Sequence, residues 1–460
     1  MKNIFKILTL FIGLATISSC DNTDLNLDPT RPGGDNVSVR AIVPAMQTQT
    51  HRNMMANGAR LAGIIMQQWA GFDAQQVAFT QYNIGEGDIA NLWEFGLYVG
   101  SMKDCDDIIT RTTTSGNLHT RGLARLYYAY NLGMATNLWG DIPFSEAFKG
   151  ADNLTPAYDS QEDVYTAIIN LLDGAIADLN TTDPAGIFGN LTSGPSSASD
   201  WAAVAHALKA RYLLQQSKVN PGVMASVISE VNQSFTSNDG QPEFVFENTS
   251  GGRNPISAFG AERPNTMVIG PSFATLMTGD PRQEKYMFQD GTDFLFYDSS
   301  NADLFWAQQD SPSLLISYAE VKFIEAEALL STGGNALMAL QAAVTANMEY
   351  LGVPAGDITT YVNALTLTGT AQQQLETIIT EKYKAFYGHN AIEAWNDYRR
   401  TGFPTLTADA NGANGNNPSG IVPLRFLYPD SERLANSANY NAAISNQGGH
   451  LLDDPLWVWR

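Results

Sequence analysis

The sequence predicts an all-α protein built from about four helical hairpins of the tetratricopeptide type, interrupted by long irregular loops. Two observations lead to this prediction. Apolar residues recur every three or four positions in several stretches, which places them on one face of a helix. Short connections join these stretches, although they do not repeat with a strict period of about 34 residues.

The first two helical patterns lie in the stretches 121–140 and 159–179. The first places five apolar residues on one face: Leu123, Tyr127, Tyr130, Met134 and Leu138. Gly140 follows and ends the helix, because glycine accepts the backbone conformation found just after a helix. The second repeats the spacing with Val164, Ile168, Leu171, Leu172 and Ile176.

Two further helices are predicted later in the chain. One covers 201–216, with Asp200 as its N-cap. The other covers the segment SYAEVKFIEAEALL, in which Ala319, Phe323, Ala326 and Leu330 share one face with Leu315 just before the segment. The alanines on that face allow a neighbouring helix to approach closely.

Long stretches without a helical period separate the helices, at 181–199, 241–312 and 407–420. Loops of this length in a compact protein are usually functional or disordered. The middle stretch is rich in aromatic residues: Phe288, Phe294, Phe296, Tyr297, Phe305 and Trp306. We therefore expect a helical scaffold that carries an irregular face with many aromatic side chains.

The N-terminus has the features of an export signal. Two lysines precede an apolar run over 7–17, which is too short to span a bilayer as a helix. The segment that follows, Ile17-Ser18-Ser19-Cys20, resembles a bacterial lipobox, in which the cysteine is acylated and becomes the mature N-terminus. An ordinary secretory signal with an incidental cysteine is the alternative.

These features divide the chain into three predicted parts. Residues 1–19 form a lipoprotein signal peptide, and residues 20–40 form the acylated N-terminus and a tether. Residues 41–460 form a single helical domain with a variable insert at about 241–312.

Composition narrows the classes of partner. The chain has 26 basic and 47 acidic residues, for a formal net charge of -21. A nucleic-acid binder needs a basic patch to displace counterions from phosphates, so we expect no nucleic-acid partner. Cys105 is the only cysteine besides Cys20, so no intrachain disulfide is expected once Cys20 is acylated.

Motifs for catalysis are mostly absent from the sequence. It has no phosphate-loop, HExxH, CxxC or GxSxG pattern, and its five histidines are far apart. We therefore expect no bound metal and no cofactor. A glycosidase needs only two carboxylates about 5 to 10 Å apart, so that alternative stays open. We interpret Glu320, Glu325 and Glu327 as a solvated helix face or as members of ion pairs.

Several long motifs resemble the SusD/RagB family of outer-membrane, nutrient-binding lipoproteins. They occur in the family's order: WGDIPFSEA from Trp139, TPAYDSQEDVYTAIINLLDGAIADL from Thr155, DWAAVAHALKARYLL from Asp200, GDPR from Gly279, EKYKAFYGHNAIEAWNDYRRTGFP from Glu381, and PLRFLYPDSERLANSANY from Pro423. The acidic residues Asp21 and Asp24 resemble the signal that sends such lipoproteins to the cell surface.

This resemblance implies a lipid-anchored protein on the outer face of the outer membrane. Its hairpins pack against a SusC-like, TonB-dependent barrel, and its irregular half faces the ligand. The protein captures an oligosaccharide, or in some relatives a peptide, and delivers it to the barrel without catalysis of its own. A calcium site seen in some relatives has no recognisable counterpart here.

Aromatic rings in two loop regions are the candidate ligand contacts. Sugar rings present apolar C–H faces beside hydroxyl groups, so a flat aromatic ring among polar side chains suits them. The candidates are Phe72, Tyr82, Phe294, Tyr297 and Trp306. We expect partly exposed rings at Tyr82, Tyr297 and Trp306, with the alternative that any of them is simply part of the core.

Three other functions are weighed against glycan delivery. An oligopeptide could be the cargo of the same transport system. A glycoside hydrolase on a helical scaffold would shorten its glycan, and a purely structural tetratricopeptide scaffold would bind proteins but no small ligand.

Overall fold

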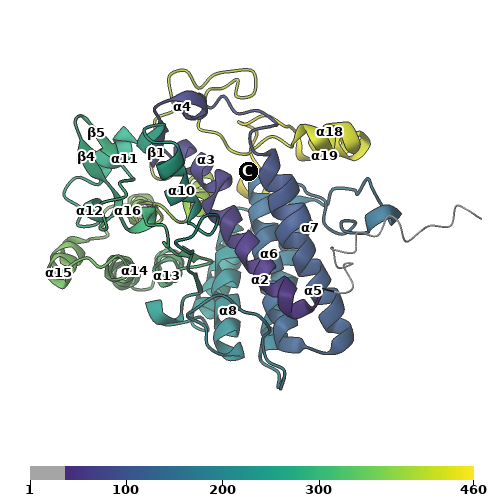
Figure 1. Ribbon diagram of the computed structural model, residues 1–460. Coiled ribbons are helices and arrows are strands. Elements are labelled where there is room, and N and C mark those ends of the chain that lie inside the picture. Colours follow the sequence, from purple (N-terminus) through teal and green to yellow (C-terminus); the bar gives the residue numbers. More distant parts are fainter. Residues whose placement is uncertain (1–36) are drawn as a thin grey trace, which may run out of the picture.

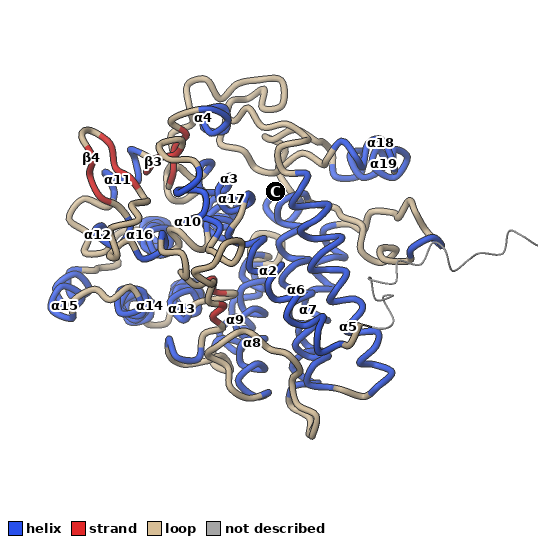
Figure 2. The backbone as a smooth tube through the Cα atoms, in the orientation of Figure 1, coloured by secondary structure: helices blue, strands red, loops and turns tan. Residues whose placement is uncertain are grey.

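The computed structural model describes residues 37–460. The predicted signal peptide, Cys20 and most of the predicted tether lie outside the described residues. The described part is mostly helical, as predicted. The long helices run side by side, and short strands and irregular loops gather on one side of them (Figures 1 and 2). No helix in residues 37–460 is long and apolar enough to cross a membrane.

Four helical hairpins form the scaffold, in agreement with the predicted number. They are α5–α6 (Met102–Ser115 and Leu118–Trp139), α7–α8 (Gln161–Leu179 and Ala198–Gln215), α13–α14 (Tyr318–Thr332 and Ala336–Tyr350) and α16–α17 (Ala371–Ala385 and Ala391–Thr401). Helix α6 packs against α7, α8 packs against α13, and α13 packs against α16. The hairpins therefore form one continuous stack.

The other helices are shorter or lie around this stack. They are α2 (Val39–Met55), α3 (Asn57–Ile65), α4 (Ala74–Thr80), η3 (Leu92–Ser101), η4 (Gly150–Asp152), η5 (Pro221–Val223), α9 (Met224–Val231), η6 (Asn238–Gly240), α10 (Pro255–Glu262), α11 (Pro271–Leu276), α12 (Gln283–Tyr286), η7 (Phe305–Ala307), α15 (Ala355–Ala364), α18 (Asp430–Ala435), α19 (Ser437–Gln447) and η8 (Trp457–Trp459). The stretch 241–312, expected to be irregular, contains several of these short helices.

Three small antiparallel sheets complete the fold. They pair β1 (Trp69–Gly71) with β3 (Met267–Ile269), β2 (Glu243–Phe244) with β6 (Ser313–Leu314), and β4 (Phe288–Asp290) with β5 (Asp293–Leu295). Most of these strands belong to the 241–312 insert. The first sheet ties that insert to a segment far away in the sequence, and the second pairs the start of the insert with the two residues that directly follow it.

Helix α8 begins earlier than predicted. We expected Asp200 to cap a helix starting at Trp201, but the helix starts at Ala198 and Ser197 is the N-cap. The Ser197 hydroxyl accepts a hydrogen bond from the Asp200 N–H at 3.2 Å, and the Asp200 carboxylate accepts one from the Ser197 N–H at 2.9 Å. This reciprocal capping box places Asp200 inside the first turn.

Buried ion pairs connect the hairpins. Glu320 of α13 accepts two hydrogen bonds from the Arg211 guanidinium of α8, at 2.6 and 2.8 Å, and both side chains are almost fully buried. Glu327, two turns further along α13, pairs with Arg400 of α17. Glu325 instead pairs with Lys322 nearer the surface, at 2.7 Å. Of the two interpretations offered for these glutamates, ion pairing is therefore confirmed.

The Glu320 ion pair supplies a stability test. We expect Glu320→Gln to lower the free energy of unfolding by about 3–5 kcal/mol, because it leaves the buried Arg211 charge with only the more distant Glu393 carboxylate, 3.8 Å away. Glu325→Gln on the same helix is the matched control and costs less than about 1 kcal/mol. Urea unfolding of both variants measures the difference, and equal losses would contradict the role given to Glu320.

Three histidines supply a pH test. Burial lowers the pKa of His51 to about 3 and the pKa values of His389 and His450 to about 4. The unfolded chain therefore binds three protons, as the pH falls from about 6.5 toward 4, that the folded chain does not bind. Each histidine reduces the free energy of unfolding by about 1.4 kcal/mol per pH unit in that window.

Urea unfolding at pH 7 and pH 5 measures this effect. We expect His389→Gln to weaken the pH dependence. An unchanged pH dependence in His389→Gln would show that this imidazole takes up its proton without unfolding.

Candidate functional site

Two loop regions far apart in the sequence meet on the strand-bearing side of the molecule. Strand β1 pairs with β3 through Trp69 and Ile269, Ala70 and Val268, and Gly71 and Met267. Strand β5 of the β4–β5 hairpin packs beside β3. This arrangement brings the segment after β1 close to the segment around β5 (Figure 1). We call the three segments 72–82, 263–269 and 288–297 the loop surface.

Three predicted contact residues lie on the loop surface with accessible rings. Phe72 is 58% exposed, and its N–H donates a hydrogen bond to the Thr266 carbonyl at 2.9 Å, which fixes the segment that carries it. Phe294 and Tyr297 are half-buried. The Tyr297 ring lies directly over Gly260 of α10, where a Cβ atom would come within 2.5 Å of the ring.

Phe294 and Tyr297 line two different pockets on either side of β5. Phe294 lines a pocket of about 270 Å³ together with Asp293, Thr292, Thr275 and Thr278. Tyr297 lines a smaller pocket, of about 110 Å³, with the exposed polar residues Arg263 and Asn265. Phe296, between them, packs inward against Trp69, with ring centroids 6.1 Å apart.

The expected exposure of Tyr82 was wrong, since its side chain is only 1% exposed. Its ring lies beneath Gly412, and its hydroxyl accepts a hydrogen bond from the Asp409 N–H at 3.4 Å. Its carbonyl accepts another from the Asn414 side chain at 3.0 Å. Tyr82 therefore anchors the Asn- and Gly-rich 407–420 loop.

The expected exposure of Trp306 was also wrong, since its side chain is only 2% exposed. Its indole stacks on the His389 imidazole at 4.4 Å and packs against Gly388. Like Tyr82, it offers no free ring face to a ligand in this conformation and instead supports the residues around it.

Backbone conformation distinguishes the loop surface from the scaffold. Five non-glycine residues in the described part of the chain have a positive φ: Gln67, Ala74, Tyr82, Phe148 and Asn265. All but Phe148 lie in or beside the loop surface. A non-glycine residue in this region costs about 1–3 kcal/mol, and such residues cluster at functional sites.

Sequence reasoning missed the polar members of the loop surface. Arg263, Asn265 and Asp293 are the residues placed to donate to or accept from a hydroxylated ligand. Nothing in their local spacing identifies them, because β1, β3 and β5 come together only in the folded chain. The one local signal is Asn265, since asparagine is enriched at positive φ.

One buried carboxylate near this side of the molecule, Glu381, is paired with two cations. Glu381 accepts hydrogen bonds from the side chains of Arg282 at 2.7 Å, Lys384 at 2.9 Å and Tyr361 at 2.8 Å. Burial opposes its ionisation, but the two cations lower the pKa of Glu381 overall, so it holds no proton at neutral pH. No group of three or more His, Cys, Asp or Glu side chains in residues 37–460 is arranged to hold a metal ion.

The fold and sequence identify the family. A family model described as "SusD-like", "starch-binding associating with outer membrane", matches residues 35–429. The chain belongs to the SusD-like family. This confirms the resemblance found in the sequence, and no curated protein sequence matches the chain.

Solved structures agree with the SusD-like assignment. A SusD/RagB family protein from Bacteroides thetaiotaomicron has 26% identity and a TM-score of 0.75, with 92% of this chain and 99% of that chain covered. A structure described as a chitin-binding protein has 22% identity and a TM-score of 0.77, with 92% and 100% covered. A chitin-binding SusD homologue from Flavobacterium johnsoniae has 20% identity and a TM-score of 0.75, with 92% and 98% covered.

The packing of Trp306 supplies a test of its supporting role. Gly388 has φ +80°, and a Cβ there would lie 2.5 Å from the Trp306 ring. Gly402 has φ +81°, with nothing within 4 Å of such a Cβ, so it is a matched control. We expect Gly402→Ala to cost about 1–2 kcal/mol of unfolding free energy, from backbone strain alone. We expect Gly388→Ala to cost more unfolding free energy than Gly402→Ala and to shift the emission maximum of the tryptophan fluorescence. Equal losses and an unchanged spectrum would show that Trp306 is free to move.

Proposed function

We propose that this SusD-like chain is a cell-surface lipoprotein that captures an oligosaccharide nutrient and delivers it to a SusC-like, TonB-dependent outer-membrane transporter. The observation that carries the glycan assignment is the loop surface, where the exposed Phe72 and the half-buried Phe294 and Tyr297 lie among polar side chains. Rings of this kind stack on the C–H faces of sugars, while Arg263, Asn265 and Asp293 bond to the hydroxyls.

The contact residues within this proposal are Phe72, Phe294 and Tyr297. Tyr82 and Trp306 have a supporting role, because their buried rings hold the 407–420 loop and the chain around Gly388 in place. Starch in the family description and chitin in the names of two structural relatives support a glycan as the ligand class.

Anchoring and delivery complete the proposal. Acylation of Cys20 holds the protein on the outer membrane, and the hairpin stack offers a rigid body for docking on the barrel. A gene for a TonB-dependent barrel directly upstream would support this partnership.

The hydrolase alternative is less well supported. A general acid needs a raised pKa so that it carries a proton at neutral pH. Glu381, a buried carboxylate that reaches a pocket, instead has a lowered pKa because Arg282 and Lys384 surround it.

Calorimetry tests the binding role. The full chain, solubilised in a detergent without a sugar headgroup, is titrated with maltohexaose, chitohexaose, hexagalacturonate and a peptide mixture. We expect saturable binding of a neutral glycan. Phe72→Ala and Tyr297→Ala each weaken it about tenfold, which corresponds to about 1.4 kcal/mol.

Phe95→Ala is the matched control for these variants. Phe95 is 63% exposed, but it belongs to η3 and not to the loop surface, so its loss leaves the affinity unchanged. Binding of peptides alone would replace the glycan with a peptide cargo. Shorter glycan products after incubation would support the hydrolase alternative instead.

A further inference from the structure

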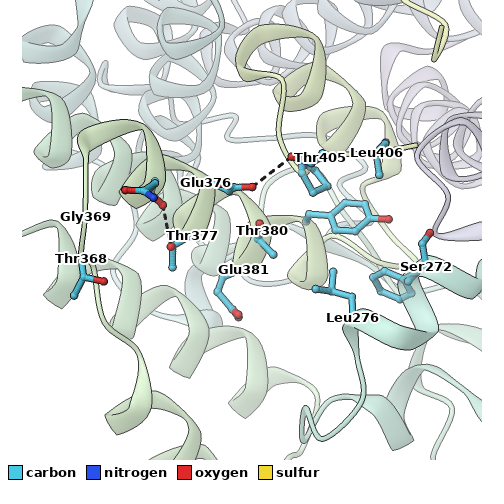
Figure 3. Close-up of a pocket in the computed structure, with 14 residues that line it drawn as sticks. Ser272, Leu276, Thr368, Gly369, Glu376, Thr377, Thr380, Glu381, Thr405 and Leu406 are labelled. Atoms are coloured by element: carbon cyan, nitrogen blue, oxygen red, sulfur yellow. Dashed lines mark hydrogen bonds between the residues drawn. The ribbon is translucent and has the colours of Figure 1, made fainter. Parts of the chain in front are cut away.

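A large pocket among the described residues lies beside the loop surface but is separate from it. It has a volume of about 710 Å³, within the range of about 300–1,000 Å³ typical of small-molecule sites. We call it the α16 pocket, because α16 supplies much of its wall (Figure 3). Helix α11 lies between the two: Ser272, Phe273 and Leu276 line the α16 pocket, whereas Ala274 and Thr275 line the pocket that contains Phe294.

Hydroxyl and amide groups dominate the polar lining of the α16 pocket. They belong to Ser272, Thr368, Gln373, Thr377, Thr380 and Thr405. The Thr377 hydroxyl donates to the Gln373 carbonyl at 3.0 Å, which leaves its lone pairs to accept a hydrogen bond from a ligand. Groups that both donate and accept match a ligand with many hydroxyls.

The apolar part of the pocket is held rigidly. Phe273 and Tyr383 meet edge to face, with ring centroids 5.4 Å apart, and both are buried. The Tyr383 hydroxyl donates to the Met66 carbonyl at 2.7 Å, so it is not available to a ligand. Phe273 and Tyr383 are only 1% and 3% exposed, so they form a rigid backing for the pocket wall, and Leu276 and Leu406 are the half-buried apolar side chains that can contact the C–H faces of a sugar.

Charge restricts the ligand further. The charged residues that line the pocket are Glu376 and Glu381, and no lysine or arginine does. Arg282 and Lys384 form ion pairs with Glu381. Glu376, in contrast, receives only a long hydrogen bond of 3.4 Å from Thr405 (Figure 3). A carboxylated or sulfated ligand would meet the Glu376 charge without a compensating cation.

We propose that the α16 pocket is a second binding site, which takes a short neutral oligosaccharide and rejects acidic ones. The ligand class rests on the proposed function, but the site and its selectivity do not depend on the loop surface. An oligosaccharide bound to both the α16 pocket and the loop surface would contact the protein on both sides of α11.

Hydrogen exchange measured by mass spectrometry separates the two sites. The full chain is incubated with maltohexaose, chitohexaose or hexagalacturonate, and amide protection is followed in 371–385 for the α16 pocket and in 288–297 for the loop surface. We expect a neutral hexamer to protect 371–385 and hexagalacturonate to leave this segment unprotected.

Variants of similar chemistry localise the effect. Thr377→Trp fills the pocket and abolishes protection of 371–385, and Thr405→Trp does so from the 402–406 loop. Thr359→Trp is the matched control, because Thr359 makes the same hydroxyl-to-carbonyl bond on α15, at 2.8 Å to Ala355, outside the pocket. Phe72→Ala leaves protection of 371–385 in place. Glu376→Gln raises the affinity for hexagalacturonate at least fivefold.

Each remaining outcome overturns a defined part of these proposals. Protection of 288–297 alone removes the second site and leaves the proposed function standing. Protection of neither segment overturns both, and equal protection of 371–385 by hexagalacturonate overturns the neutral-ligand assignment. Protection of 371–385 that persists in both tryptophan variants also removes the second site.

Discussion

Buried ion pairs between helices are the constraint on which the rest of this structure depends. Helix α13 places Glu320 against Arg211 of α8 and Glu327 against Arg400 of α17, so one helix fixes the relative positions of three hairpins. Removing such charges from water is costly, and the pairs are tolerated only because each carboxylate receives several hydrogen bonds. Hydrophobic packing allows small slides between helices, whereas a two-point arginine–carboxylate bond does not.

A second buried network extends this constraint to the ligand side. Arg282, in the insert, bonds both to Asp280 beside it and to Glu381 of α16, with the Arg282 side chain fully buried. Burial opposes ionisation of Asp280, but the neighbouring Arg282 lowers its pKa to about 2. The network therefore stays charged at neutral pH. It fixes the segment that follows α11 to the scaffold. Helix α11 forms a wall of the α16 pocket and of the pocket that contains Phe294.

The aromatic residues of the loops divide into two roles that depend on this rigid support. Tyr82 and Trp306 fill the layer beneath the surface, where they hold the 407–420 loop and the turn at Gly388. Phe72, Phe294 and Tyr297 remain accessible above them. A binding surface gains affinity when its rings are already held in place, because less conformational freedom is lost on binding. The strained residues Ala74 and Asn265 show that the scaffold imposes this arrangement on the loops.

The sequence by itself determined the helical class, the four hairpins and the family, because these depend on local spacing, helix capping and long motifs. Gly140 ends its helix as expected, with positive φ, since helix termination is a local property of the chain. The sequence also pointed to the two loop regions that carry the proposed contacts. Only the tertiary structure decided which rings are accessible, because burial depends on residues that are far away in the sequence. Tyr82 is covered by Gly412 and Trp306 by His389, and no local pattern foretells either contact. The α16 pocket likewise exists only where α11, α16 and the 402–406 loop are brought together by long-range packing.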